Sequence, residues 1–493
     1  MRVLFVASEL APLSQSGGLG DAVSGLARAL GDRGHDVTCL IPAYRSALQS
    51  PACPALVDVG PVRIGFPGFE LWGRILTGEL FPNVDVELVD LPALYDRAGL
   101  YGEGGHDYDD NALRFIALSR AAAYRAEATQ PDVVVAHDWQ AALTVCLLRT
   151  SLDRGPVRGV ACVQVVHNNA HQGRVGGDSL GLTSLAPDLL HPDGLEAWGS
   201  LCLLKGGLMW ADRIIAVSPT YAREVQHPAL GEGLDGAYRS RAHRLLGIRN
   251  GIDTLRYDPE TDLTLGAPYS ARSLAGKAAC RAALLAQTKI EAPPPGLLLC
   301  AVGRLAAQKG WDVLLAAIDG LLDLGASFVL LGDGDRALAR ALEAKALQHP
   351  RRIWFRAAYD EALSRRIYAG SDAVLIPSRF EPCGLVQLIA QRYGTVPMAH
   401  ATGGLLDTIV DPMFHARHPT AGEEWSGATG VLFSPLSADA LIGGVRRVAR
   451  LGATGGLPAI QSSLLALEVG WDGPAQAWEA VLADVAAEAR RRI

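Results

Sequence analysis

Short apolar runs alternate with amphipathic stretches along almost the whole chain, and this alternation limits the possible folds more than any other feature of the sequence. In the first half the apolar runs are Arg2–Ser8, Asp36–Pro42, Asp85–Asp90, Asp132–Ala136, Gly159–Val166 and Arg213–Val217. Apolar strands that alternate with helices are typical of a parallel sheet covered by helices on both faces. The first half is therefore predicted to be a doubly wound α/β domain.

The same pattern begins again in the second half. Strands are expected at Leu297–Val302, Ser327–Leu331, Ile353–Phe355, Asp372–Ile376 and Val396–Ala399, and helices at Gly310–Leu324, from Arg336, and at Glu361–Ala369, Gly384–Tyr393, Gly404–Val410 and Ala438–Leu451. The polar, glycine-rich stretch Asp411–Gly427 reads as a surface loop. Because 493 residues exceed the roughly 100–200 residues of a usual domain, two Rossmann-like domains facing a deep cleft are predicted.

Charge and hydropathy exclude several classes of partner. The net charge is −7, so no basic surplus exists to neutralise the phosphates of a nucleic acid or an anionic membrane. No apolar run reaches the roughly 18 residues of a membrane span. The N-terminus is apolar only from Val3 to Ala7 and then meets Glu9, which is typical of a buried strand rather than a signal peptide.

The eight cysteines are scattered, and no two of them form a C-x-x-C pair. Zinc-binding and redox frameworks are therefore not expected, and a reducing, cytoplasmic location fits. No closely spaced cluster of histidine and acidic residues stands out either, so the sequence predicts a site without a metal or cofactor.

The segment 376–394 reads as the end of a strand, a polar loop and the start of a helix. In open α/β sheets ligands bind at the carboxyl ends of strands and against helix N-termini. Glu381 lies in this loop, just ahead of the helix. From its position alone, Glu381 fits a helix-capping acid as well as it fits a ligand-binding acid.

Two further loops have the same strand-to-helix position. The run from Gly17 to Asp21 contains glycines that would let a phosphate approach backbone N–H groups, although a glycine-rich turn without a ligand fits equally well. In the second loop, Arg304 and Lys309 could hold a diphosphate. Two solvated loop cations are the alternative there. Neither loop has the G-x-G-x-x-G pattern of dinucleotide binding.

Histidines end two strands of the first half. His137 and Asp138 follow one strand, and His167 and Asn168 follow another. A single histidine in such a place is more often structural than catalytic. Two such pairs at one edge of a parallel sheet favour a functional role.

Taken in order, these residues resemble the bacterial glycogen synthases and plant starch synthases, which are retaining glycosyltransferases of the GT-B fold. The matching motifs are SGGLGD at 16–21, LYGEGGHDYDDNALRF at 100–115, AHDWQAAL at 136–143, VVHNNAHQG at 165–173, LKGGLMWADRIIAVSPTYAREV at 204–225, RNGID at 249–253, GRLAAQKGWD at 303–312, SRFEPCGLVQL at 378–388 and TGGLLDT at 402–408. So many ordered matches make the resemblance specific.

The resemblance implies transfer of glucose from ADP-glucose to the non-reducing end of an α-1,4-glucan, with retention of configuration and without a metal. It also implies a hinge just before the NGID segment, although the proline-rich stretch 292–296 would suit a linker by composition. The expected domains are therefore 1–246 on the glucan side and 247–474 on the nucleotide-sugar side. The last helix, 475–493, is expected to pack back on the first domain.

Roles for individual residues follow from the matched motifs. Arg304 and Lys309 resemble the clamp for the diphosphate, and Glu381 resembles the acid that contacts the transferred glucose. His167 is similar to the histidine that touches sugar hydroxyls, and Asp138 to an acid near the reacting centre. Further donor contacts are implied at Gln15, Gly17, Gly18, Asp21, Tyr95, Asn250, Cys383, Gly384, Leu385, Thr402, Gly403 and Gly404.

Three departures from the family pattern all lie in the first half. Gln15 takes the place of the usual lysine, Asn169 and His171 replace an apolar residue and an aromatic, and Gln140 replaces a histidine. These changes leave open a donor such as UDP-glucose, or a catalytically weak glucan-binding or priming protein. A glucan phosphorylase has the same type of fold, but no pyridoxal-phosphate lysine site is apparent. The oligomeric state is not indicated by the sequence.

Overall fold

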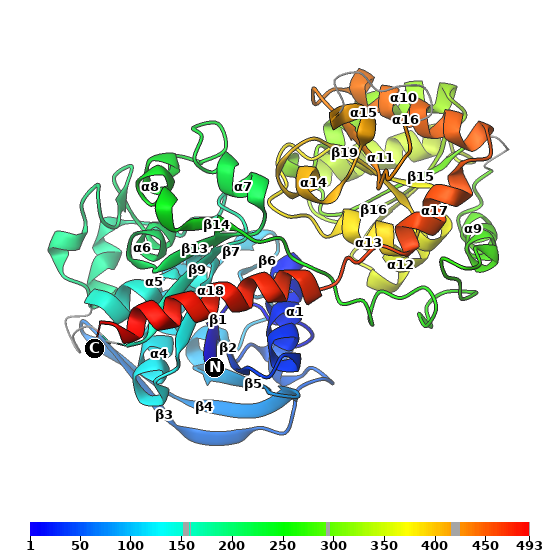
Figure 1. Ribbon diagram of the computed structural model, residues 1–493. Helices are drawn as coiled ribbons and strands as arrows, with labels where there is room; N and C mark the ends of the chain where they lie inside the picture. Colours follow the sequence, from blue (N-terminus) through cyan, green and yellow to red (C-terminus); the bar gives the residue numbers. More distant parts are fainter. Residues whose placement is uncertain (151–156, 158, 292–295, 416–423, 493) are drawn as a thin grey trace. The chain divides into compact units, whose positions relative to one another are not determined.

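The computed structural model describes residues 1–150, 157, 159–291, 296–415 and 424–492 (Figure 1). Contacts divide the chain into two compact units, one formed by Met1–Gly251 with Trp471–Ile493 and the other by Ile252–Gly470. The first boundary between the units therefore lies after Gly251, inside the NGID segment, and not after residue 246. Asn250 is thus part of the N-terminal unit. Residues 292–295 of the proline-rich stretch 292–296 lie outside the described residues.

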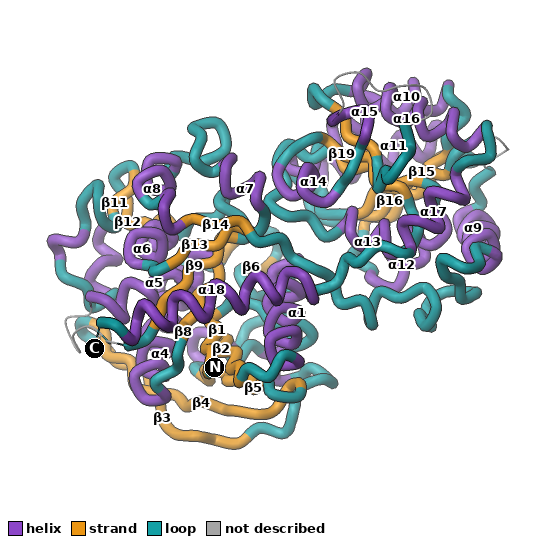
Figure 2. The backbone as a smooth tube through the Cα atoms, viewed as in Figure 1, coloured by secondary structure: helices purple, strands orange, loops and turns teal. Residues whose placement is uncertain are grey.

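The N-terminal unit contains a nine-stranded sheet in the order β14-β13-β9-β8-β1-β2-β5-β4-β3 (Figure 2). Its parallel strands are β1 (Arg2–Val6), β2 (Asp36–Pro42), β5 (Val84–Asp90), β8 (Val133–His137), β9 (Ala161–Val166), β13 (Arg213–Ala216) and β14 (Leu245–Gly247). The strands β1, β8 and β9 are direct neighbours, so the segments that follow them meet at one edge of the sheet.

The other edge of this sheet was not predicted. It is an antiparallel hairpin of β3 (Val57–Phe66) and β4 (Phe69–Phe81), with β4 antiparallel to β5. One face of the hairpin is exposed, so along β3 the buried Val62, Ile64 and Phe66 alternate with exposed residues such as Arg63. Such a strand has no continuous apolar run, and the sheet is mixed rather than wholly parallel.

The helices of this unit are α1 (Gly18–Asp32), α2 (Arg45–Leu48), α3 (Pro92–Tyr95), α4 (Asn111–Thr129), α5 (Asp138–Thr150), α6 (Leu203–Trp210), α7 (Pro219–Glu224), α8 (Asp235–Ser240) and α18 (Asp472–Arg490). Small antiparallel pairings add β6 (Gly102–Glu103) with β7 (His106–Asp107), and β12 (Ser200–Cys202) with β10 (Arg174–Val175) and β11 (Glu196–Ala197).

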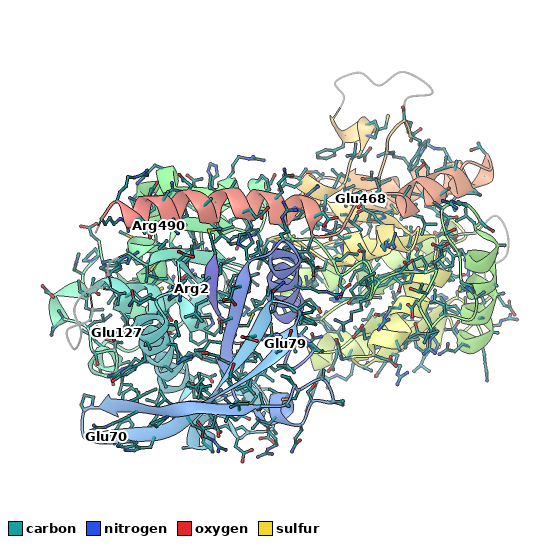
Figure 3. The ribbon with its side chains drawn as sticks, turned by 60° about the horizontal axis from the view of Figure 1, so that its bottom comes forward. Arg2, Glu70, Glu79, Glu127, Glu468 and Arg490 are labelled. Carbon is teal, nitrogen blue, oxygen red and sulfur yellow. The ribbon has the colours of Figure 1, made fainter. Side chains whose placement is uncertain are left out.

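The C-terminal helix α18 packs on the N-terminal unit. Its apolar face is buried, with Trp478 only 2% exposed. Ion pairs fix its C-terminal end, since Arg213 reaches Glu488 at 2.6 Å and Arg490 reaches Asp132 at 2.8 Å. Figure 3 shows Arg490 at the end of this long helix.

The C-terminal unit contains a six-stranded parallel sheet in the order β17-β16-β15-β18-β19-β20. Its strands are β15 (Leu298–Val302), β16 (Ser327–Gly332), β17 (Ile353–Ala357), β18 (Ala373–Ile376), β19 (Val396–His400) and β20 (Val431–Phe433). The order 3-2-1-4-5-6 is that of a Rossmann fold, in which the direction of winding reverses between β15 and β18.

Apolar side chains cover both faces of this sheet. Leu298 and Cys300 point into one core and Leu299 and Ala301 into the other, which explains why the strand is apolar throughout. The helices are α9 (Ala275–Thr288), α12 (Glu361–Gly370) and α13 (Val386–Arg392) on the first core, α10 (Trp311–Asp323), α11 (Arg336–Gln348) and α16 (Ala438–Ala453) on the second, and also α14 (Gly403–Thr408), α15 (Pro412–His415) and α17 (Leu457–Leu465).

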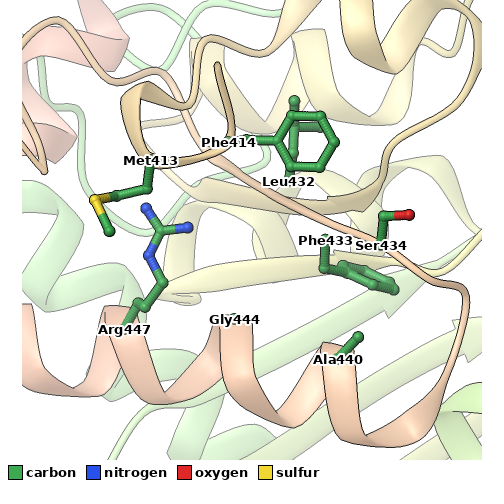
Figure 4. A pocket seen from close by; sticks show the side chains of 8 residues that line it. All are labelled: Met413, Phe414, Leu432, Phe433, Ser434, Ala440, Gly444 and Arg447. Carbon is green, nitrogen blue, oxygen red and sulfur yellow. The ribbon is translucent and has the colours of Figure 1, made fainter. Parts of the chain in front are cut away.

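The start of the predicted surface loop 411–427 is buried structure. Asp411 has no exposed side chain, and its two oxygens accept hydrogen bonds of 2.9 and 2.8 Å from Arg447. Residues 416–423 lie outside the described chain. Arg447 also lines a pocket of about 240 Å³, together with Met413, Phe414, Leu432, Phe433, Ser434, Ala440 and Gly444. Figure 4 shows the side chains of these eight residues. None of the predicted site residues lines this pocket.

No helix within the described residues is both long enough and apolar enough to cross a membrane.

Candidate active site

In the C-terminal unit the predicted residues follow the adjacent strands β15, β18 and β19. These strands flank the point at which the winding of the sheet reverses, where open α/β sheets bind their ligands. Gly310 lets the first two loops approach each other. It has a φ of 67°, and a Cβ atom at this position would lie 1.8 Å from the carbonyl oxygen of Pro377. A side chain here would push the loops apart.

The close approach brings Lys309 and Glu381 together. The Lys309 Nζ atom lies 2.6 Å from Glu381 Oε2, and the Ser378 hydroxyl donates to the same oxygen at 3.1 Å. The Glu381 side chain is only 9% exposed. In the described part of the chain its carboxylate bonds to no backbone N–H of α13. Of the two roles that the sequence left open, capping of this helix is therefore excluded by the geometry.

Arg304 lies in the same loop as Lys309, but its side chain does not take part in the Lys309–Glu381 ion pair. Its backbone is fixed by the Trp311 indole, which donates to the Arg304 carbonyl at 2.8 Å. The guanidinium is exposed, and no residue of the described ranges hydrogen-bonds or ion-pairs with it. The loop therefore presents one cation that is neutralised by a carboxylate and one that is available to an anion.

The third loop packs tightly against the Glu381 loop. A Cβ atom at Gly404 would lie 2.3 Å from the Cys383 carbonyl oxygen, and Gly384 and Gly403 have φ angles of 73° and 46°. The Gly404 N–H donates to the Glu381 carbonyl at 2.9 Å. This N–H group is therefore already used within the protein, and the donor contact at Gly404 stays a prediction. Thr402 and Cys383 are buried, and Leu385 precedes α13.

In the N-terminal unit Asp138 and His167 end neighbouring strands and contact each other. Asp138 begins α5 with a φ of 56°, and its Oδ1 accepts hydrogen bonds from the backbone N–H groups of His167 at 2.6 Å and Asn168 at 3.3 Å. Burial raises the pKa of Asp138 to about 7. The two backbone N–H groups oppose this rise, and the charge of Glu9 adds to it.

His137 and His167 form a second contact between the same strand ends, with 3.0 Å between His137 Nδ1 and His167 Nε2. The His137 ring also meets Phe5 edge to face, with 5.0 Å between centroids. Burial lowers the pKa of His167 to about 3 and also holds the pKa of His137 well below its usual range. Both rings are therefore neutral near pH 7.

Glu9 is a functional candidate that the sequence reasoning missed. It is 3% exposed, and it accepts hydrogen bonds from the Ser16 N–H at 2.8 Å, the Ser16 hydroxyl at 2.7 Å and the Tyr101 hydroxyl at 2.7 Å. These bonds fix the glycine-rich loop that leads into α1. The available signal was a carboxylate directly after a buried strand at the edge where Asp138 also lies.

The glycine-rich loop itself has the predicted strand-to-helix position. Gly17 and Gly18 are exposed at the start of α1, and Asp21 lies in its first turn. A Cβ atom at Gly20 would lie 2.8 Å from Gln15 Cβ, so the loop turns back on itself at Gln15. These four predicted residues are therefore brought together around one helix N-terminus.

The prediction of a ligand contact at Tyr95 has no support in the structure. This side chain is fully buried, its hydroxyl donates to the Arg114 carbonyl at 2.7 Å, and its ring packs against Tyr44. Tyr95 was implied by the family resemblance alone, and in the structure the carbonyl of the buried Arg114 gives its hydroxyl a polar partner inside the core.

Within the described residues no group of three or more histidine, cysteine or acidic side chains could hold a metal ion.

Comparison with known proteins agrees with these two units. Residues 2–240 match the family model "Starch synthase catalytic domain", and residues 296–450 match "Glycosyl transferases group 1". A glycogen synthase of Rhodopseudomonas palustris (strain BisA53) is 41% identical over 97% of this chain and 96% of its own, and one of Myxococcus xanthus (strain DK1622) is 38% identical over 99% and 100%. The chain belongs to the glycogen and starch synthase family.

A solved structure supports the same assignment. The catalytic domain of starch synthase IV from Arabidopsis thaliana, bound to ADP and acarbose, has a TM-score of 0.89 and 30% identity and covers 99% of both chains. This member of the glycogen synthase family is thus a glycosyltransferase of the GT-B fold, with two Rossmann-like domains.

One departure from the glycogen synthase pattern has a structural explanation. Asn169 is 1% exposed, its amide donates to the Gly231 carbonyl at 2.8 Å, and its Oδ1 accepts from the Tyr238 hydroxyl at 2.8 Å. The backbone N–H of Asn169 donates to the Tyr221 hydroxyl at 2.8 Å. This polar replacement therefore makes a satisfied buried network and does not leave an uncompensated polar group.

Proposed function

We propose that this chain transfers glucose from ADP-glucose to the non-reducing end of an α-1,4-glucan with retention of configuration, in cytoplasmic glycogen biosynthesis. The observation that carries the proposal is the arrangement of Arg304, Lys309 and Glu381 at the strand ends where a Rossmann sheet binds its ligand. The ADP and acarbose in the related starch synthase structure support a nucleoside diphosphate and a glucan-like acceptor.

The two cations would act on the leaving diphosphate. As the bond from glucose to the diphosphate breaks, negative charge grows on the phosphate oxygens. The Arg304 guanidinium can bind these oxygens with two parallel N–H groups, and Lys309 supplies a point charge. Glu381 holds the Lys309 ammonium at 2.6 Å and so keeps it in place before the donor arrives. Once the phosphate takes over that contact, Glu381 can accept hydrogen bonds from the glucose.

The N-terminal strand ends would serve the sugar and the acceptor. Asp138 and His167 offer a carboxylate and a neutral imidazole, which suit hydroxyl groups and a developing positive charge on the sugar ring. The loop around Gly17 and Gly18 offers backbone N–H groups at a helix N-terminus, which suit a phosphate oxygen. Gln15 contributes a neutral side chain at the place of the usual lysine.

Retention is proposed to occur on one face of the sugar. The leaving phosphate would accept the proton of the incoming hydroxyl while that hydroxyl bonds to the anomeric carbon, so the proton lost by the acceptor is gained by the nucleotide. This scheme needs no covalent intermediate, and we propose no metal or cofactor for it.

The test is incorporation of radiolabelled glucose into glycogen, with ADP-glucose and UDP-glucose compared side by side at equal concentration. We expect incorporation from ADP-glucose and much less from UDP-glucose. Greater incorporation from UDP-glucose would overturn the donor assignment. If neither donor is used although glycogen is still bound, the chain is a glucan-binding or priming protein and the enzyme proposal fails.

A further inference from the structure

His137 and His167 form a hydrogen-bonded pair, and the proposed function gives no role to His137. His137 is 1% exposed, and its Nδ1 lies 3.0 Å from His167 Nε2. The other nitrogen of His137, Nε2, is buried and has no hydrogen-bond partner among the described residues. His167 is only partly buried, so its ring is the more accessible of the two, and this ring carries the other nitrogen, Nδ1.

Only two arrangements of protons fit a hydrogen bond between two neutral imidazoles. In the first, His137 carries its proton on Nδ1 and donates to His167 Nε2, so His167 carries its proton on Nδ1. In the second, His167 donates from Nε2, and His137 must carry its proton on the buried Nε2. The second arrangement leaves an N–H group buried without an acceptor, whereas the first leaves only an unused lone pair.

Buried N–H groups without a partner are rarer than buried acceptors without one, because the donor loses a strong bond to water. The first arrangement is therefore the stable one. Burial that lowers the pKa of both rings keeps the pair uncharged, which removes a third arrangement with an imidazolium.

We propose that His137 is a positioning residue that fixes His167 as the tautomer with its proton on Nδ1, so that His167 presents a neutral N–H donor to a sugar oxygen. This inference rests on the proposed function for the identity of the acceptor oxygen, but not for the tautomer. A neutral donor suits a hydroxyl or ring oxygen, whereas a charged one would bind the diphosphate instead.

The neighbouring residue strengthens the argument. Asp138 Oδ1 accepts the backbone N–H of His167 at 2.6 Å, while His137 holds the ring of the same residue. Two consecutive residues at the end of β8 therefore fix both the main chain and the side chain of His167. The His167 ring is attached to the chain at Cγ and hydrogen-bonded at Nε2, so the direction of its Nδ1–H group is also restricted.

The test is a measurement of the histidine tautomers in the full-length protein, labelled with ¹⁵N-histidine. The His167 signals are assigned by their loss in His167→Gln. We expect His167 Nδ1 to be protonated and Nε2 to be unprotonated in the absence of any substrate. A protonated His167 Nε2 would overturn the proposal.

Two substitutions separate positioning from packing. In His137→Asn the amide N–H can take the place of Nδ1–H and donate to His167 Nε2, whereas in His137→Leu it cannot. We expect His137→Leu to give mixed tautomers and a kcat/KM for ADP-glucose about 10-fold lower, which is the loss that one hydrogen bond typically represents. His137→Asn should keep the tautomer and most of the activity.

Equal loss in both variants, with the His167 tautomer unchanged, would show that His137 has a packing role only. If His137→Leu does not fold, the wild-type tautomer and the His137→Asn variant still decide. A failure of the proposed function would be seen as no incorporation from either donor, and the tautomer measurement would be unaffected by it.

Discussion

In the N-terminal unit the residues after β1 and β8 are two buried carboxylates, Glu9 and Asp138, and a pair of neutral histidines joins β8 to β9. In the C-terminal unit the residues after β15 and β18 are two cations and the carboxylate of Glu381. Both sets lie at the carboxyl ends of central parallel strands, so the fold does not explain the difference. The difference lies in charge: one unit offers hydrogen bonds and buried acids, and the other offers positive charge.

We propose that the two similar sheets serve different parts of one reaction, the diphosphate and the sugar. A diphosphate that gains charge in the transition state needs cations, and a neutral sugar needs directed hydrogen bonds. Substitutions in the C-terminal set should therefore act mainly on kcat through charge. Substitutions in the N-terminal set should act through pH dependence, tautomer or KM.

The largest effect is expected for Glu381→Ala, because it removes the proposed sugar contact and releases Lys309 from its only described carboxylate partner. We expect kcat to fall by at least about 10³-fold with an unchanged melting temperature. The matched control is Asp319→Ala, which breaks the exposed pair that Asp319 makes with Lys345 at 2.7 Å. Retained activity in Glu381→Ala would mean that the C-terminal set is structural.

Lys309→Ala should lower kcat by about 10²–10³-fold, the usual cost of one charge-stabilising donor. Lys345→Ala is the control, since it removes a similar lysine–carboxylate pair on α10 and α11. Single-turnover rates would separate chemistry from product release. If KM rises and kcat does not change, Lys309 binds the ground state and the contrast between the units is weaker than proposed.

Asp138→Asn should lower kcat/KM by about 10²-fold, since the negative charge that we propose to act on the sugar is lost. In the wild type kcat/KM should rise with pH and inflect near pH 7, because burial raises the pKa of Asp138 to about 7 and the carboxylate is the working form. The inflection should be absent in Asp138→Asn. A pH–rate profile of the two proteins checks this, and an unchanged inflection would assign the titration to another group.

The same shift has a consequence for stability. The folded pKa of Asp138 is raised above the unfolded value of about 3.8, so proton binding stabilises the folded state. That stabilisation is complete below pH 4 and is lost as the pH rises through 7. Melting temperatures between pH 5 and pH 8 should therefore fall more steeply for the wild type than for Asp138→Asn.

The fold could be read from the sequence because both sheets are buried on two faces and so give continuous apolar runs. The strand at Asp36–Pro42 was predicted to the residue, and the boundaries of most others moved by only one or two positions. The hairpin of β3 and β4 was missed because one of its faces is exposed. The early start of the buried region at Asp411 was missed because its partner Arg447 is far away in sequence.

The site was harder to predict because it depends on which neighbours occupy a hydrogen bond. Sequence identified Asp138, His167, Lys309 and Glu381 as candidates, and the structure joins them in two pairs. The sequence alone could not reveal that the Gly404 N–H donates to the Glu381 carbonyl, or that Glu9 fixes the glycine-rich loop. Such contacts depend on differences of a few tenths of an ångström in the distance between separate loops.

Glu9→Gln should raise KM for ADP-glucose about 5- to 10-fold and change kcat less. Each described group around the Glu9 side chain donates to it, so an amide NH₂ placed there would face donors and loosen the loop at Ser16. Glu70→Gln, at an exposed ion pair with Arg63, is the control and should have no effect. Equal KM values would show that the loop holds its shape without the charge.

The smallest effect is expected for Gln15→Lys, which restores the family's charge to the N-terminal unit. A charge-assisted hydrogen bond is about twice as strong as a neutral one, so KM for ADP-glucose should fall about 3- to 10-fold while kcat changes little. Gln15→Met, with a similar length and no charge, should not lower KM. If Gln15→Lys leaves KM unchanged or raises it, the loop has adapted to glutamine. A Cβ atom at Gly20 would lie 2.8 Å from Gln15 Cβ, so residue 15 is closely packed at its base, and the neutral glutamine would then be a built feature of this loop.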